Sequence, residues 1–518
     1  MTDPWFARAC PRASSHPAPS RDDDPTHQPS RDFKEFHHGH PCPNQAPTRA
    51  RDERTTFIQL LRRFHFHAGI LVGPFLLVTA ITGFLYALAP AAEQVIHADQ
   101  IHASSTAQTV ALDRQVATAQ EQHPALQVSG VIVGKPGDTT RVMFDDATLK
   151  SSSYRRAVFV DPGTGAVRGD TVLYGSGQSF PERAWLSELH RRLLLGDVGR
   201  IYSELAASWL APITLVGLIL WWRGRRNRSQ TAGGKTLSAR GKTLSAGGRT
   251  LRSHRRIGVV IALGLFFLSA TGLTWSQYAG QNVTNLRNAL DWKTPVVKTD
   301  LPGSPVAPAG GEHADHAGGG TTAAEPVVPV DGSALLRAAS TAKQQLRAPY
   351  EITPMAAGKA WKVRETRHSW TMGPNAVAVD PASGSVTSRS DFADWPVAAK
   401  LTDWGIRLHM GLVFGLANQI GLAALALALG ITIVQGYRMW WPRRPTRATG
   451  WQSGRAPKAG AFLRLARSRP VPVALGSLAV LAWCWLAPLF ATSLAGFLIV
   501  DAALRSAKKE TGEGSCCS

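Results

Sequence analysis

The chain contains two copies of one long unit, and each copy carries two histidines in the same register. In each copy the first histidine precedes glycines by 4 and 18 residues, and the second precedes glycines by 6 and 27 residues. A Trp-Trp pair follows the second histidine by 31 and 32 residues. The repeated residues are His65, Gly69, Gly83, His190, Gly196, Gly217 and Trp221-Trp222 in the first copy, and His254, Gly258, Gly272, His409, Gly415, Gly436 and Trp440-Trp441 in the second. Four histidines kept in register predict paired ligands for a metal cofactor.

Five apolar segments divide the 518 residues. They lie at about 66–89, 202–222, 257–275, 420–441 and 471–500. As a helix, each is long enough to cross a hydrocarbon core of ~30 Å, and polar stretches separate them. The sequence therefore predicts a polytopic membrane protein whose first partner is the lipid bilayer.

The net charge of +21 is concentrated in short loops beside these segments. Residues 223–256 carry 11 Lys or Arg and no acidic residue, and residues 438–469 carry 9 and no acidic residue. Because Lys and Arg in short loops mark the cytoplasmic side, we expect the N-terminus and both basic loops inside and the two long insertions outside. The basic residues flank apolar spans instead of forming one globular face, so we expect no nucleic-acid partner.

The duplicated unit is a span, an outer domain and a second span. Two such units with the same orientation are parallel repeats, related by an axis along the membrane normal. We therefore predict an all-α polytopic membrane bundle with a four-helix core, a fifth apolar segment and two outer α+β domains. The predicted segments are a disordered cytoplasmic tail 1–56, TM1 57–90, outer domain 98–185, amphipathic helix and TM2 186–222, basic cytoplasmic loop 223–253, TM3 254–279, outer linker 280–328, outer domain 329–400, amphipathic helix and TM4 401–441, basic cytoplasmic loop 442–470 and TM5 471–504.

Both outer insertions contain the same turn. Asp161-Pro162 and Asp380-Pro381 each begin 29 residues before the second histidine of their copy. Alternating strands run into these turns, where Pro presets φ and a following Gly tolerates positive φ. We predict hairpins at matching places, with helices near 107–122 and 333–346 and strands near 128–133, 140–144, 156–160, 361–365 and 376–379. Neither insertion has a cysteine, so we expect each domain to be held by its own core.

The two ends of the chain raise separate questions. The first 50 residues contain no apolar core of a signal peptide, so TM1 is expected to act as an uncleaved signal anchor. The last segment is long for one span and has Pro488 in its middle. A single kinked helix would place the C-terminus outside, and a re-entrant pair would place it inside. We favour the single kinked span.

The topology places the repeated histidines in two pairs. His65 and His254 begin outward-going spans and are expected at the cytoplasmic face. His190 and His409 precede inward-going spans and are expected near the outer face. A break at 196–200 is expected to put His190 on a short helix at the outer surface. Two sites on the pseudo-twofold axis, each with two imidazoles, follow from this arrangement.

Two imidazoles between helices are a suitable axial ligand set for haem iron. Glycines near the histidines would let a flat ring approach the backbone, and nearby arginines would pair with its propionates. These arginines are Arg62, Arg63, Arg255, Arg256, Arg191, Arg192, Arg200 and Arg407. A zinc or iron site would need further Cys or carboxylate ligands, which we do not expect in the spans. Copper stays open.

Each of these residues also has a simpler interpretation. A histidine at the end of a span is often an interfacial residue, glycines often serve helix packing, and Trp pairs often form an aromatic belt. Four histidines kept in register while most neighbours differ favour a cofactor over these roles. No role is assigned to His67, His97, His368, His313 and His316 in the linker, or the histidines at 37–42 in the tail.

Several motifs together point to one family. They are Arg63-Phe64-His65 with Thr82-Gly83, Leu189-His190 followed by the run 193–200, Leu408-His409 with Phe414-Gly415, both Trp-Trp-basic exits, and Asp-Pro-x-x-Gly-x-Val at 161–167 and 380–386. Over about residues 57–505 the chain resembles the PepSY-associated transmembrane family, which includes inner-membrane ferric-siderophore reductases and iron-regulated membrane proteins. The chain departs from the family pattern at Arg252-Ser253-His254, where relatives often have Asp-Leu-His.

The resemblance implies a location and a function. It implies a bacterial inner-membrane protein with a cytoplasmic N-terminus and two periplasmic PepSY-like domains, 98–185 and 329–400. In siderophore-reducing relatives it implies haem electron transfer across the membrane. We therefore predict two b-type haems, one on His65 and His254 and one on His190 and His409. They would pass electrons to a periplasmic acceptor, most simply ferric iron in a siderophore.

The electron donor and two other functions stay open. No nucleotide-binding glycine pattern follows a strand, so we expect no flavin domain and a separate donor, either a cytoplasmic protein or a quinol. In one alternative the PepSY domains bind or regulate peptidases or envelope partners, and the spans are cofactor-free anchors. A metal permease would need membrane-embedded carboxylates, which we do not expect in the first four spans.

Overall fold

A computed structural model of the chain describes residues 46–104, 109–232, 246–301, 330–366, 368–443 and 466–513. The chain divides into two compact units, Met1–Arg51 and Asp52–Ser518, and the spans, the sheet and the repeated histidines lie in the second. Most of the predicted tail, the linker residues His313 and His316, and the middle of both basic loops fall outside the described residues.

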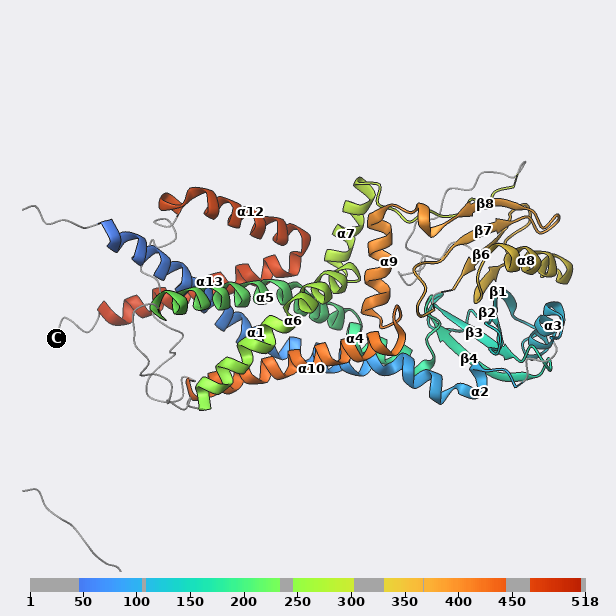
Figure 1. Ribbon diagram of the computed structural model, residues 1–518, viewed down its shortest axis with the longest axis horizontal. Coiled ribbons are helices and arrows are strands. Elements are labelled where there is room, and N and C mark those ends of the chain that lie inside the picture. The colour runs from blue at the N-terminus through green and yellow to red at the C-terminus, as the bar shows by residue number, and fades with distance from the viewer. Residues whose placement is uncertain are drawn as a thin grey trace, which may run out of the picture. The chain divides into compact units, whose positions relative to one another are not determined.

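Among the described residues, four long helices are apolar enough to cross a membrane, as predicted. They are α1 (Ala46–Ile96, apolar over Phe57–Ile96), α5 (Gly196–Ala232), α6 (Ala246–Thr274) and α10 (Gly415–Trp440). They run alongside one another as a bundle (Figure 1). Small and apolar side chains such as Ala68, Ala206 and Leu265 fill its interior. Helices form here because each span satisfies its own backbone hydrogen bonds without water.

A short helix precedes each of the spans α5 and α10. These are α4 (Pro181–Arg192) and α9 (Val397–His409). A break between short helix and span is present in the first copy, but it lies earlier than the predicted 196–200, because α4 ends at Arg192 and residues 196–200 already belong to α5. Leu193 turns the chain there with a φ of 49°. Gly411, with a φ of 76°, does the same in the second copy. Both short helices lie between the spans and the sheet (Figure 1).

The final apolar segment forms two helices. They are α12 (Pro470–Leu486) and α13 (Pro488–Glu513), and the chain bends by 120° between them. Pro488 lacks the N–H that a continuous helix would use at this point. The single kinked helix predicted over 471–504 is therefore not observed, and the bent pair is either a broken span or a re-entrant hairpin. The other short helices are α2 (Ala98–Ile101), α3 (Leu112–Gln122), α7 (Tyr278–Ala289), α8 (Gly332–Gln345), η1 (Phe392–Asp394) and η2 (Trp441–Arg443).

The two long insertions form one antiparallel sheet of eight strands, in the order β4-β3-β2-β1-β5-β6-β7-β8. The strands are β1 (Gln127–Val133), β2 (Thr140–Asp145), β3 (Tyr154–Val160), β4 (Val167–Tyr174), β5 (Tyr350–Thr353), β6 (Trp361–Glu365), β7 (Ala376–Val379) and β8 (Val386–Ser390). The copies meet where β1 pairs with β5, with Val131 opposite Ile352. All predicted strands are confirmed, and β5 is a strand that we did not predict.

The predicted outer domains 98–185 and 329–400 share their largest buried cluster, and each also has a smaller cluster of its own. Helices α3 and α8 contribute Ala119 and Ala338 to a single buried cluster that also contains strand residues of both copies. Arg155 and Glu351 form an ion pair of 2.8 Å between the copies. Separate domains would each leave an unpaired strand edge, and pairing β1 with β5 satisfies both edges at once.

The two predicted turns are confirmed at matching places. The carboxylates of Asp161 and Asp380 each accept a hydrogen bond from the N–H two residues further on. Gly165 and Gly384 close the turns, each with a φ of +74°. A residue with a Cβ rarely adopts this conformation, which explains why both copies have glycine there.

The shared core predicts that damage in one copy loosens the other. Ile352→Ala removes a fully buried side chain at the β1–β5 junction and should cost about 2–5 kcal/mol. Hydrogen exchange should then rise in β2 of the first copy as well as in β6 of the second. Val386→Ala, at a side chain 39% exposed on the edge strand β8, is the control. A rise confined to the second copy would mean that the cores are independent.

Candidate cofactor site

The four repeated histidines come together in two pairs, as their register predicted. His65 on α1 and His254 on α6 have ring centres 6.3 Å apart. Both lie in the first half of their helices, and both helices start at the end of the bundle away from the sheet (Figure 1). His190 on α4 and His409 on α9 have ring centres 6.5 Å apart, at the end near the sheet. We call these the far pair and the sheet-end pair. Each pair takes one histidine from each copy, as a twofold axis through the bundle requires.

Each ring of the far pair is oriented by a main-chain oxygen of a neighbouring span. Nδ1 of His65 lies 3.1 Å from the carbonyl oxygen of Ile213 on α5. Nδ1 of His254 lies 3.0 Å from the carbonyl oxygen of Thr432 on α10, which is the equivalent position. Because a carbonyl oxygen only accepts, we assign the proton of each ring to Nδ1. Each Nε2 then keeps its lone pair.

Two threonines give the rings of the sheet-end pair the same tautomer, with the proton on Nδ1. The hydroxyl of Thr82 lies 2.9 Å from Nδ1 of His190, and that of Thr271 lies 2.7 Å from Nδ1 of His409. Both hydroxyls donate their own proton to a carbonyl one turn earlier in the helix, so they accept from the ring N–H. All four histidines thus present an unprotonated Nε2, and a second partner on Nδ1 is the usual arrangement for a metal-bound histidine.

The surroundings of the sheet-end pair keep both rings neutral. Burial, together with Arg191, lowers the pKa of His190 to about 4. Burial, together with His190, lowers the pKa of His409 to about 3. Tyr86 stacks on His190, and its counterpart Trp275 contacts the edge of His409, with ring centres 6.3 and 5.3 Å apart respectively. Only a neutral imidazole has a lone pair to offer a metal.

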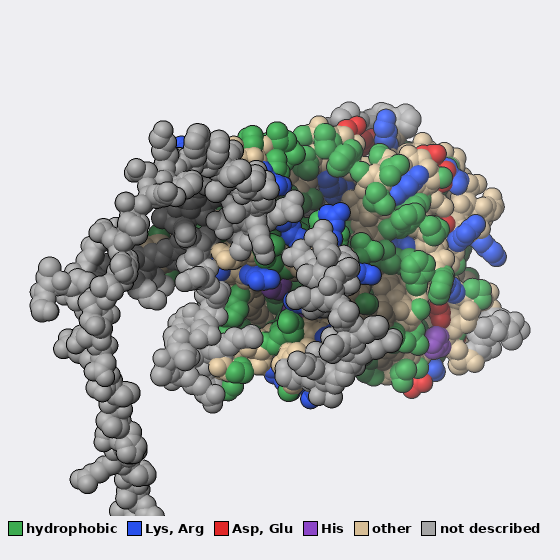
Figure 2. Space-filling view, turned by 60° about the vertical axis from the view of Figure 1, so that its left-hand side comes forward, with side chains coloured by type: hydrophobic (Ala, Val, Ile, Leu, Met, Phe, Trp, Pro, Cys, Tyr) green, Lys and Arg blue, Asp and Glu red, His purple; other side chains and the backbone are tan. Residues whose placement is uncertain are grey.

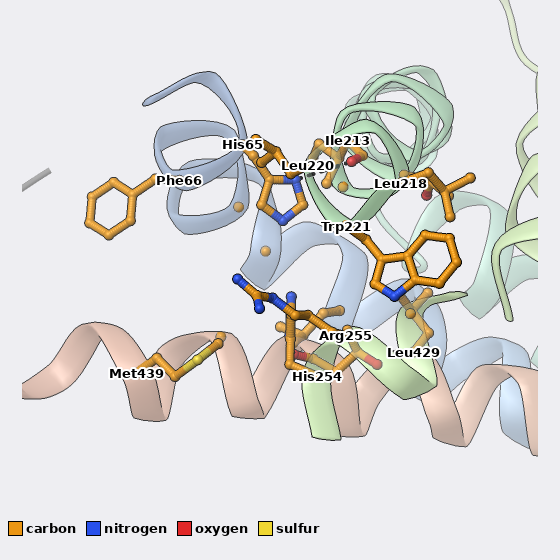
Figure 3. Close-up of a pocket in the computed structure, with 18 of the residues that line it drawn as sticks. His65, Phe66, Ile213, Leu218, Leu220, Trp221, His254, Arg255, Leu429 and Met439 are labelled. Carbon is orange, nitrogen blue, oxygen red and sulfur yellow. Dashed lines mark hydrogen bonds between the residues drawn. The ribbon is translucent and has the colours of Figure 1, made fainter. Parts of the chain in front are cut away.

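A cavity of about 650 Å³ is lined by both rings of the far pair (Figure 3). Its lining follows the duplication: apart from Gly73 and Gly224, every lining residue has a counterpart from the other copy in the lining. Gly69 and Gly258 are one such couple, and a Cβ added at either would meet no atom within 4 Å. Glycine therefore leaves open space beside both histidines. The volume is typical of cofactor sites, which range over about 300–1,000 Å³.

Two of the arginines predicted to bind an anionic group line this cavity, Arg62 and Arg255. Figure 2, which turns this end of the bundle toward the viewer, shows Lys and Arg side chains among the described residues there. Other predicted arginines are engaged elsewhere. Arg407 is buried and donates to the carbonyl oxygen of Thr371, and Arg191 donates to Glu188 and Tyr174.

Helix α1, which lines the cavity through Ile70 and Gly73, contains a proline whose missing hydrogen bond is replaced from another helix. Pro74 has no N–H to bond the carbonyl oxygen of Ile70 in α1. The hydroxyl of Tyr437 on α10 donates to that oxygen at 2.6 Å. Gly73 admits the phenol, because a Cβ there would lie 3.0 Å from the Tyr437 hydroxyl. No sequence signal pointed to Tyr437, since its counterpart in the first copy is Leu218.

The expectation that the first four spans lack carboxylates is wrong. Glu204 lies in α5 with only 1% of its surface exposed. It accepts hydrogen bonds from the N–H groups of Tyr278 and Ala279, at 3.0 and 2.9 Å, at the start of α7. A carboxylate at a helix N-terminus is stabilised by the unsatisfied N–H groups there. The Glu204 carboxylate therefore caps α7, and it gives no support to the metal-permease alternative.

The distance between the two rings within each pair suits a metal whose other ligands belong to a cofactor. Two imidazoles bonded to opposite sides of one metal at about 2 Å have ring centres about 6 Å apart, close to the observed 6.3 and 6.5 Å. Among the described residues, no group of three or more His, Cys, Asp or Glu could hold a metal ion. A haem supplies four equatorial ligands of its own and needs only axial ones. The spacing of the two imidazoles in each pair thus fits a haem.

Comparison with protein families identifies the chain. A model of the PepSY-associated TM region matches residues 62–443. The chain belongs to the PepSY-associated TM family. This confirms the resemblance at the level of the family, and the match includes all four paired histidines while α12 and α13 follow it. A search among curated proteins finds no match.

The threonine bonds in this PepSY-associated protein predict a matched pair of variants. Thr82→Val keeps the shape of the side chain but leaves the buried Nδ1–H of His190 without its acceptor, which should cost about 1–3 kcal/mol. Thr79→Val, whose hydroxyl bonds only its own helix, should cost less. Thermal unfolding in detergent measures both, and Thr82→Ser should restore stability. Equal losses for the two valine variants would remove the role assigned to Thr82.

Proposed function

We propose that this PepSY-associated membrane protein is a di-haem, b-type electron-transfer protein. The observation that carries the proposal is the common state of four paired histidines, each with Nδ1 engaged by a protein acceptor and Nε2 available. His65 and His254 would hold one haem, and His190 and His409 the other. A bound haem supplies one-electron transfer. The protein orients the rings, fixes their tautomer and keeps them out of water.

The far pair is proposed to face the cytoplasm of a bacterial cell, with the sheet in the periplasm. At the far end of α5, Arg225 lies over Trp221 and Arg226 over Trp222, with guanidinium carbons 5.7 and 4.5 Å from the ring centres. Arginines beside a span mark the cytoplasmic side, and tryptophans mark the interface. Electrons would then enter at the far pair and leave at the sheet-end pair.

The separation of the pairs suits transfer across a membrane. His65 and Thr82, the partner of His190, are 17 residues apart on α1, which corresponds to about 25 Å of helix. A hydrocarbon core is about 30 Å thick. The two pairs would therefore serve opposite faces of the bilayer.

The proposed acceptor is ferric iron in a siderophore. Oxygen ligands of the hydroxamate type hold the harder ferric ion much better than the ferrous ion. Transfer of one electron converts Fe³⁺ to Fe²⁺ and so loosens the complex. The donor would be a separate cytoplasmic protein or a quinol, because the sequence has no recognisable flavin-binding pattern.

The alternative is a cofactor-free protein that binds or regulates peptidases or other envelope partners. The open sheet favours it, since among the strands of the described residues β4 and β8 stand at the two ends of the order and each pairs with one neighbour. An unpaired strand edge can accept an extended segment of a partner. This alternative predicts that partner binding does not depend on the four histidines.

Removing one histidine should remove one haem. We expect His254→Ala and His409→Ala each to lower the haem content to about half that of the unmodified protein, because each proposed haem would lose one of the two histidines that would hold it. The double variant should hold none. His368→Ala, a histidine outside both pairs, is the control. Pyridine haemochrome absorbance per chain measures the content, and full content in His254→Ala would refute the assigned pairing.

The direction of transfer predicts which variant loses ferric reduction. Dithionite-reduced protein, freed of excess reductant and mixed with a ferric hydroxamate, should reoxidise while a ferrous chelator captures Fe²⁺. His409→Ala, with its sheet-end pair broken, should react at least tenfold more slowly per remaining haem. Stopped-flow absorbance follows the reaction. Reoxidation of that variant at the unmodified rate would contradict electron exit at the sheet-end pair.

A further inference from the structure

The helix pair α12–α13 lies outside the duplicated unit and beyond the matched family region. It nevertheless contacts α5, the helix whose Ile213 carbonyl oxygen orients His65 of the far pair. The indole N–H of Trp483 on α12 donates to the carbonyl oxygen of Ser208 on α5 at 3.1 Å. Ser208 is fully buried. This contact is specific, because the next helical turn of α5 cannot supply a donor to the same oxygen.

Pro212 is the reason that α5 supplies no donor to the carbonyl oxygen of Ser208. In a helix the carbonyl oxygen of Ser208 would accept from the N–H of residue 212, and proline has none. An unpaired carbonyl inside a membrane bundle is costly, and Trp483 supplies the missing donor. Tyr437 does the same for Pro74 in α1. Helices α1 and α5 beside the far pair thus each lack one backbone hydrogen bond at a proline, and in each an aromatic side chain from another helix supplies the missing donor.

The residue after Pro212 is the one that orients His65. Ile213 presents the carbonyl oxygen that accepts from Nδ1 of His65 at 3.1 Å. The position of this oxygen depends on the turn that Pro212 interrupts and Trp483 completes. In the second copy the place of Pro212 is taken by Ile431. There Thr432 orients His254 from a helix without a proline, so the two histidines are supported differently.

Further contacts fix the helix pair to the bundle. Trp209 on α5 donates to the hydroxyl of Ser493 on α13 at 2.9 Å, and its ring packs on Phe490 with centres 4.7 Å apart. Asn282 on α7 donates to the carbonyl oxygen of Trp485 at 2.9 Å. Trp483 is therefore held in place by several anchors around the bend.

We infer that α12–α13 is a positioning element for His65, acting through Trp483, the Pro212 turn and the Ile213 carbonyl. The part of this inference that concerns a bound haem rests on the proposed function. The part that concerns α5 does not. Trp483 touches no reacting group, and its effect on the site is indirect.

A double-mutant cycle tests the link. Trp483→Phe removes only the donor, and hydrogen exchange in peptides covering residues 205–217 of α5 should rise by about fivefold, the effect of one hydrogen bond. Pro212→Ala restores an N–H at residue 212, so Trp483→Phe should have little effect in that background. Ser493→Ala, which removes an anchor of α13 and leaves the turn intact, is the matched control.

A second measurement, on the unmodified protein, Trp483→Phe, Pro212→Ala and the double variant, reports the orientation of the histidine ring. The low-spin ferric EPR signal of a bis-histidine haem depends on the orientation of its rings, so one of two signals should shift in Trp483→Phe. It should return in the double variant with Pro212→Ala. Unchanged exchange in Trp483→Phe, or equal effects in both backgrounds, would overturn the inference. Protein without haem would refute the proposed function, while the exchange cycle would still decide the role of Trp483.

Discussion

The hydrogen bond from Nδ1 of each paired histidine is the interaction on which the rest of the structure depends. Each of the four bonds joins different helices: α1 to α5, α6 to α10, α4 to α1 and α9 to α6. Together they tie the spans and the two short helices into one frame. They also leave the same nitrogen free in all four rings. Packing of the bundle and readiness to bind a cofactor therefore have one physical origin.

The duplication explains why there are two histidine pairs. Departures from the duplication explain why the two histidines of the far pair have different surroundings. The twofold relation extends from the cavity lining to the sheet, where β1 and β5 pair across the axis. Pro74 and Pro212 interrupt helices of the first copy only, and Tyr437 and Trp483 compensate for them. His65 and His254 consequently sit in unequal surroundings within a symmetric frame. If the far pair holds a haem as proposed, unequal support of its two histidines would tune that site without altering the other.

Much of this arrangement followed from spacing and composition. Apolar length predicted the four spans, the Asp-Pro turns predicted the hairpins, and the register of His65, His254, His190 and His409 predicted which rings would meet. These features depend on local sequence or on the repeat itself. The long-range contacts could not be predicted from spacing and composition. Pairing of β1 with β5, the Tyr437 and Trp483 donors and the Glu204 cap are set by which surfaces meet in three dimensions, and no periodic pattern marks them. Thr82 and Thr271 were visible as repeated residues, but their role needed the geometry.

The central claim is that both histidine pairs bind haem. The most direct test is the absorption spectrum of the detergent-purified protein, made with adequate haem supply, before and after dithionite. The account predicts sharp α and β bands on reduction and about two b-type haems per chain by pyridine haemochrome, as two bis-histidine sites require. A featureless visible spectrum would contradict it. The open sheet would then become the place to seek a function.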